Sequence, residues 1–154
     1  MGTNKLDTVK ILLDVGASLD YRTFTGSTVL INAVGNEDSD PNVLRLILEK
    51  FKSSCSPEEF SLILNYKKKS TTLKWKSINY VARTLYRTGI SKSGLMRFLA
   101  VDSGTTALNL AVMRGDVEIA KLLLEYGADP YVENDLRMNA FDVCDKYGPY
   151  PSVV

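Results

Sequence analysis

The residues best suited to chemistry form a basic cluster in the middle of the chain. Residues 50–100 hold eleven Lys and Arg against two Asp and Glu, whereas the other residues hold eight and sixteen. A patch this dense attracts carboxylates or phosphates. Three interpretations are open. The cluster is a solvated helical face, a site for an acidic peptide or the acidic part of another subunit, or a site for nucleic acid or anionic lipid. Its central lysines are Lys67, Lys68, Lys69, Lys74 and Lys76.

Trp75 lies between two of these lysines and has two possible roles. Its ring could stack on a nucleic-acid base beside the positive charges. It also continues an apolar stripe at helical spacing, which favours packing in the core. The members of that stripe are Trp75, Ile78, Val81, Ala82 and Leu85.

Residue types needed for catalysis or metal binding are scarce. The chain has no histidine, which excludes Ser-His-Asp and Cys-His nucleophiles and any His-ligated metal. Cys55 and Cys144 lack metal-ligand spacing and predict reduced thiols in a cytoplasmic or nuclear protein. The acidic residues fall at expected helix starts and on exposed faces, so no acid–base pair is predicted. We therefore predict a protein that is not an enzyme and that has no cofactor and no metal site.

The overall numbers set further limits. A chain of 154 residues is long enough for one domain with a real core. Its net charge of +1 shows that the basic cluster is balanced by acidic residues elsewhere. No apolar run approaches the roughly 20 residues of a transmembrane helix, and no signal peptide is visible.

Two short helices in residues 102–134 are the best-defined structural elements. Thr106 can cap the first helix and Gly115 can end it, while Asp116 can cap the second. Each helix is apolar on one side only, and such helices must stack against neighbouring copies to bury that side. The predicted apolar positions are Leu108, Ala111, Val112, Ile119, Leu122 and Leu123.

This unit closely resembles an ankyrin repeat, whose period is about 33 residues. Gly104, Thr106 and Leu108 stand where the family has Gly-x-Thr-Pro-Leu-His, and Gly127-Ala128-Asp129 matches its Gly-Ala-Asp ending. The proline and histidine of that pattern are replaced, by Ala107 and Asn109 in this unit. The resemblance implies an all-α solenoid of stacked helix-turn-helix units with short, β-hairpin-like fingers. It also implies protein–protein recognition, without naming the partner.

The same pattern divides the chain into one ankyrin-type domain over residues 1–154. We predict a partial repeat at 1–18, a repeat at 19–51, an atypical basic insert or degenerate repeat at 52–101, a repeat at 102–134 and a partial repeat at 135–154. Within the insert, the capping box Ser56-Pro57-Glu58-Glu59 predicts one helix, and 73–88 and 93–100 predict two more.

Both ends cut through predicted repeats. The chain therefore reads as a piece of a longer ankyrin-repeat protein, with Met1-Gly2-Thr3 as a cloning remnant. Uncovered apolar faces at the two ends predict end-to-end homodimers.

The resemblance places partner contacts on the finger tips and the first-helix face. The alternative for finger aromatics is packing on their own neighbours. We predict a non-catalytic scaffold or adaptor; the alternatives are a regulatory segment of a larger enzyme or channel, and binding of nucleic acid or lipid by residues 67–97. The candidate contact residues are Tyr21, Arg22, Phe24, Asn32, Asn109, Met113, Arg114, Tyr131, Glu133, Asn134, Leu136 and Arg137.

Overall fold

A computed structural model describes residues 5–36, 38–90 and 93–147. Within these ranges the regular structure is entirely helical, which confirms the prediction of an all-α fold. Met1–Thr3 and the turn predicted at Gly148 lie outside the described residues. The helices are α1 (Lys5–Asp14), α2 (Val29–Gly35), α3 (Pro41–Ser54), α4 (Pro57–Leu64), α5 (Leu73–Arg87), α6 (Gly94–Asp102), α7 (Ala107–Arg114), α8 (Val117–Glu125) and α9 (Ala140–Tyr147).

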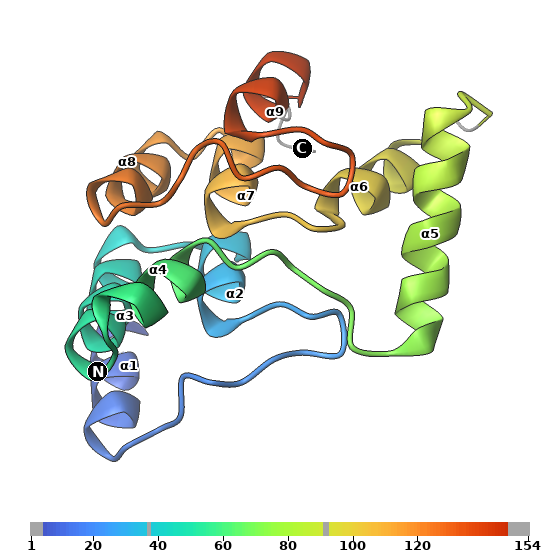
Figure 1. The fold of residues 1–154 in the computed structure, drawn as a ribbon. Helices are drawn as coiled ribbons and strands as arrows, with labels where there is room; N and C mark the ends of the chain where they lie inside the picture. The colour runs from blue at the N-terminus through green and yellow to red at the C-terminus, as the bar shows by residue number, and fades with distance from the viewer. Residues whose placement is uncertain (1–4, 37, 91–92, 148–154) are drawn as a thin grey trace.

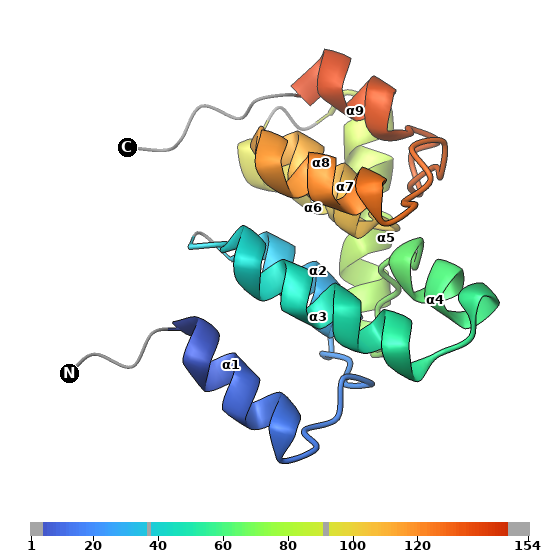
Figure 2. The ribbon, with the colours of Figure 1, turned by 90° about the vertical axis from the view of Figure 1, so that its left-hand side faces the viewer.

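Six of these helices form two stacked rows (Figure 1). One row is α2, α7 and α9, in which α7 contacts both neighbours. The second row is α1, α3 and α8, in which α3 contacts both neighbours. Figure 2 shows the helices of this second row one above another, with α5 behind them. The rows bury apolar side chains between them, although α1, at the end of its row, leaves Ile11 and Leu12 exposed.

Side-chain caps begin several helices, including those predicted at Thr106 and Asp116. The Thr28 and Thr106 side chains accept hydrogen bonds from the Ile31 and Asn109 N–H groups, and Asp116 accepts from Ile119. Such caps satisfy backbone donors that have no partner within the helix. The core between the rows contains large side chains that are almost completely buried, including Leu30, Leu44, Leu48, Leu108, Ile119 and Leu123.

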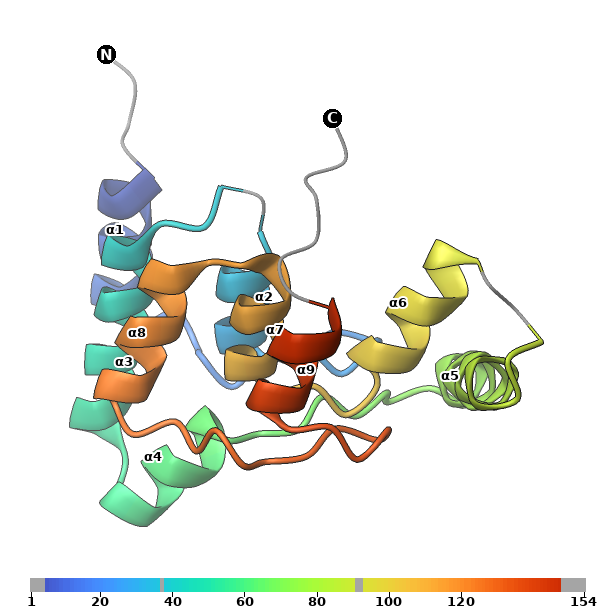
Figure 3. The ribbon, with the colours of Figure 1, turned by 90° about the horizontal axis from the view of Figure 1, so that it is seen from above.

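The segment between α3 and α7 does not interrupt either row. Although α4, α5 and α6 lie between them in sequence, α2 contacts α7 and α3 contacts α8 directly. The helices α5 and α6 pack on each other and stand beside the α2–α7–α9 row (Figure 3). The helices α5 and α6 therefore occupy no place in either row.

Three extended loops lie along one side of the stack. We call them loop 1 (15–28), loop 2 (65–72 with 103–106) and loop 3 (126–139). The Thr71 N–H donates to the Phe24 carbonyl at 3.3 Å, and the Asp135 N–H donates to the Ser103 carbonyl at 3.1 Å. Loop 2 is closed by bonds between Lys68 and both Gly104 and Thr105. The loops are therefore joined to one another through their backbones, and α5 and α6 extend from the tip of loop 2.

Candidate functional site: a cationic groove beside helix α5

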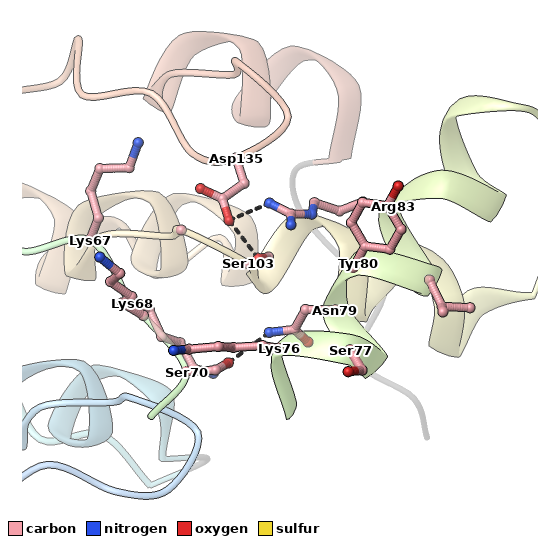
Figure 4. A pocket seen from close by; sticks show the side chains of 13 residues that line it. Lys67, Lys68, Ser70, Lys76, Ser77, Asn79, Tyr80, Arg83, Ser103 and Asp135 are labelled. Carbon is pink, nitrogen blue, oxygen red and sulfur yellow. Dashed lines mark hydrogen bonds and ion pairs between the residues drawn. The ribbon is translucent and has the colours of Figure 1, made fainter. Parts of the chain in front are cut away.

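A groove of about 820 Å³ lies between α5 and loop 2. Loop 3 contributes Asp135 to its rim (Figure 4). Its volume falls in the range of ordinary ligand sites. The lining residues are Lys67, Lys68, Lys69, Ser70, Lys76, Ser77, Asn79, Tyr80, Val81, Arg83, Ser103, Gly104 and Asp135.

The five cations of the groove fall into two kinds. Lys68 forms an ion pair with Asp102, and Arg83 forms one with Asp135 at 2.6 Å. Lys67, Lys69 and Lys76 are exposed and have no acidic partner within 4.0 Å among the described residues. The positive potential of the groove therefore comes mainly from these three side chains. We call them the groove lysines.

Three equivalent positions, in loop 1, at the end of α6 beside loop 2 and in loop 3, hold α5 and its flanking segments in place. Phe24, Asp102 and Asp135 each lie two residues before the start of a repeat motif. The Phe24 ring lies 5.9 Å from that of Trp75, measured between centroids, while the two aspartates pair with Lys68 and Arg83. As a result α5 crosses the loop tips, with its first turn at loop 1 and its later turns at loop 3 (Figure 1).

The remaining wall of the groove combines hydroxyl, amide and apolar groups. Asn79 donates to the hydroxyl of buried Ser70 at 2.9 Å, which ties α5 to loop 2. Tyr80 and Val81 are 66% and 50% exposed, so their apolar surface is open to a ligand. The arrangement suits electrostatic and apolar binding. No cluster of three or more metal-ligating side chains occurs in the described part of the chain.

Three of the predicted contact residues are buried. Asn109 donates to the Val132 carbonyl, Asn134 donates to the Val101 carbonyl, and Met113 lies in the core. These side chains position loops or fill space, and this corrects the expectation that they face a partner. Leu136 is also partly buried against the core.

The other predicted contact residues remain at or near the surface. Tyr21, Phe24 and Tyr131 are more than 60% exposed, although the Tyr131 ring contacts Phe141. The side chains of three others are exposed: Asn32, Glu133 and Arg137.

Two of the predicted arginines are engaged within the chain. Arg22 lies over the Tyr66 ring, with its guanidinium carbon 4.7 Å from the ring centroid. Arg114 donates to the carbonyls of Gly35 and Asn36, which ties α7 to the end of α2. Arg114 is therefore mainly a structural side chain, whereas Arg22 stays exposed on loop 1.

Trp75 corrects another sequence-based expectation. It was expected in the core, but it is only half-buried and covers the tip of loop 1 through Phe24. The helical spacing correctly placed Trp75 on the apolar side of α5. At Trp75, that side of the helix faces a loop tip rather than the centre of the stack.

Sequence reasoning missed several groove residues, including Asn79, Tyr80, Arg83 and Asp135. A signal existed for the aspartate, since Asp102 and Asp135 share one repeat position, 33 residues apart. Their matching pairings with Lys68 and Arg83 depend on the path of the insert. A single sequence contains no information on that path.

Asp135→Ala tests whether loop 3 holds α5. The substitution removes the acceptor used by Arg83 and by the Ser103 hydroxyl. Because Asp135 is partly exposed, we expect the free energy of unfolding to fall by only about 1–2 kcal/mol. Urea denaturation measures that loss, and hydrogen exchange should show faster exchange in α5. Asp14→Ala, at an exposed carboxylate on α1, is the control and should change stability by less than about 0.5 kcal/mol.

Comparison with known proteins identifies one part of the chain. Residues 103–135 match the family model described as Ankyrin repeat. This segment contains α7, α8 and most of loop 3, so the unit that borders the groove is an ankyrin repeat. Ankyrin repeats generally mediate protein–protein interaction, and the family is typically non-catalytic. No curated protein matches the chain.

No helix in the described ranges combines the length and the apolar character that a membrane span requires.

Proposed function

We propose that this chain is a non-catalytic protein-interaction module, acting as a scaffold or adaptor in the cytoplasm or nucleus. Its stacked helix pairs would form an ankyrin-type solenoid, with loops 1, 2 and 3 as the fingers. The partner would bind along the finger tips and the neighbouring surface of α5. Exposed Tyr21, Phe24, Tyr131 and Arg137 are the main candidate contacts on the loops.

The observation that supports this proposal most strongly is the fixed arrangement of the loops. Backbone hydrogen bonds join loop 1 to loop 2 and loop 2 to loop 3. Buried Asn109 and Asn134 hold loop 3 from within. A surface that is already ordered loses little conformational entropy on binding. Aromatic side chains exposed on such a surface are of the types that contribute most to binding energy.

Two further predictions stay open beside this proposal. The first is that the chain belongs to a regulatory segment of a larger enzyme or channel, where the same surface would bind a regulatory partner. End-to-end homodimers also remain a prediction. Exposed Ile11, Leu12 and Val15 on α1 and Phe141 on α9 would supply apolar surface for them.

A display selection tests the proposed function. Short random peptides displayed on phage are selected on the wild-type chain and then measured against a loop variant, Tyr21→Ser with Tyr131→Ser and Arg137→Gly. Losing two aromatic contacts and one arginine should weaken the selected peptides about tenfold or more. The glycine adds no strain, because Arg137 already has a φ of 60°. Fluorescence anisotropy of the labelled peptides gives the dissociation constants.

The control variant changes the opposite surface. Glu118→Ser and Lys121→Ser alter exposed side chains of α8, in the row far from the loop tips. Binding should be the same as for the wild-type chain within about twofold. If the α8 variant weakens the peptides as much as the loop variant, the finger surface is not where partners bind.

A further inference from the structure

We propose that the cationic groove binds an acidic segment of the partner protein, a short stretch of chain that carries several carboxylates and an apolar side chain. This inference rests on the proposed function, and it names the chemistry of the partner. The groove lysines would bind the carboxylates, and Tyr80 with Val81 would contact the apolar side chain.

The charge arrangement carries the first step. Cations that hold the loops together are neutralised, since Asp102 pairs with Lys68 and Asp135 with Arg83. The groove lysines are left unneutralised around one concave surface. Figure 4 shows Lys76 extending from α5 toward loop 2, where Lys67 and Lys68 lie. Gathering like charges in this way is unfavourable until an anion binds between them.

The rest of the molecule directs an acidic ligand to this place. Outside residues 50–100, acidic residues outnumber basic ones by sixteen to eight. A carboxylate-rich segment is therefore repelled by most of the surface and attracted by the insert. Such a field increases the rate of association and suppresses binding in the wrong orientation.

The composition of the walls favours a peptide over nucleic acid. A nucleic-acid strand presents a phosphate at every nucleotide and gains affinity from aromatic stacking. Here Trp75 is packed against Phe24 rather than open to a base. Exposed Tyr80 and Val81 lie next to the lysines instead. A mixed wall of this kind suits peptide side chains that alternate between acidic and apolar.

The peptides selected on the wild-type chain provide the test. The groove variant is Lys67→Glu, Lys69→Glu and Lys76→Glu, and all three side chains are exposed. The matched control is Lys10→Glu, Lys50→Glu and Lys121→Glu, which changes net charge equally on α1, α3 and α8. At an ionic strength of about 0.15 M, we expect peptides rich in Asp and Glu. Their dissociation constants should rise about tenfold or more with the groove variant and less than about threefold with the control.

Three results would overturn the inference. The first is that the selected peptides lack acidic residues. The second is that the groove variant and its charge-matched control weaken binding equally, through net charge alone. The third is that an oligothymidylate binds the groove more tightly than any selected peptide, with an affinity that falls log-linearly with salt.

The loop variant separates the two proposals. If it loses the peptides while the groove variant keeps them, the interaction module stands and the acidic-segment assignment fails. If neither variant affects binding, both fail. Circular dichroism of each variant should match the wild-type spectrum, since every substituted lysine is exposed.

Discussion

Gly26→Ala is expected to lower the free energy of unfolding by about 3 kcal/mol or more. A Cβ at this position would lie 2.0 Å from the Lys69 carbonyl oxygen and 2.3 Å from its carbonyl carbon. These are backbone atoms of loop 2 and cannot rotate away. Gly26 also has a φ of +86°, where an L-residue is strained. Loop 1 must therefore move off loop 2, with loss of the Thr71–Phe24 hydrogen bonds.

Urea denaturation measures the loss, and Gly16→Ala is the matched control. Gly16 has a similar φ of +82°, but a Cβ there meets nothing within 4 Å. Its substitution should cost only the backbone strain, about 1–2 kcal/mol. The excess loss in Gly26→Ala then measures the close packing of loop 1 on loop 2. Equal losses would show that this contact contributes nothing.

The comparison of these two glycines shows what a sequence can reveal about a loop. Gly26 and Gly104 begin the repeat motif, so a left-handed residue was predictable at both. Arg137 takes the same position in the third motif and still adopts a φ of 60°. The left-handed backbone is therefore common to the three positions, whether glycine or arginine stands there. The close approach of Lys69 to Gly26 is a contact between distant segments, and no local pattern contains it.

The helices and their caps were predictable because their signals are local. Thr28, Thr106 and Asp116 each cap the helix that follows them in sequence. The ankyrin pattern also predicted a repeat at 102–134, and the family model matches residues 103–135. Spacing of apolar residues further predicted α5 within one residue of its observed end at Arg87.

The environment of α5 was less predictable than its bounds. Of its apolar stripe only Ala82 is fully buried, whereas Val81 is half exposed. A helical stripe identifies the apolar side of a helix, but it does not say how much of that side another element covers. Here α6 and the loop tips cover part of α5, and the uncovered part forms a wall of the groove.

The groove itself could be predicted only as a cluster of charge. Of the five lysines that the sequence analysis singled out, all but Lys74 line the groove. Their division into paired and unpaired residues depends on Asp102 and on the path of loop 2. Asp135 reaches the groove only because loop 3 lies beside loop 2 in space. These relations come from tertiary structure, so sequence reasoning on one chain has no access to them.

Asn134→Ala should lower the free energy of unfolding by about 2–4 kcal/mol. The side chain is 2% exposed and makes three hydrogen bonds. Its Nδ2 donates to the Val101 carbonyl at 3.2 Å, and its Oδ1 accepts from the Leu136 and Met138 N–H groups at 2.9 and 3.1 Å. Alanine supplies none of these partners and leaves buried polar groups unsatisfied. Urea denaturation gives the loss, and hydrogen exchange at the Met138 amide shows whether loop 3 opens.

Asn32→Ala is the control for this prediction, because both asparagines were candidate partner contacts. Asn32 is exposed on α2, and alanine there suits a helix, so stability should stay within about 0.5 kcal/mol of the wild-type value. A stable Asn134→Ala variant that loses the selected peptides would instead make Asn134 a contact residue. The expected result assigns Asn134 to the interior, where it joins loop 3 to α6 and sets the position of Asp135 on the rim of the groove.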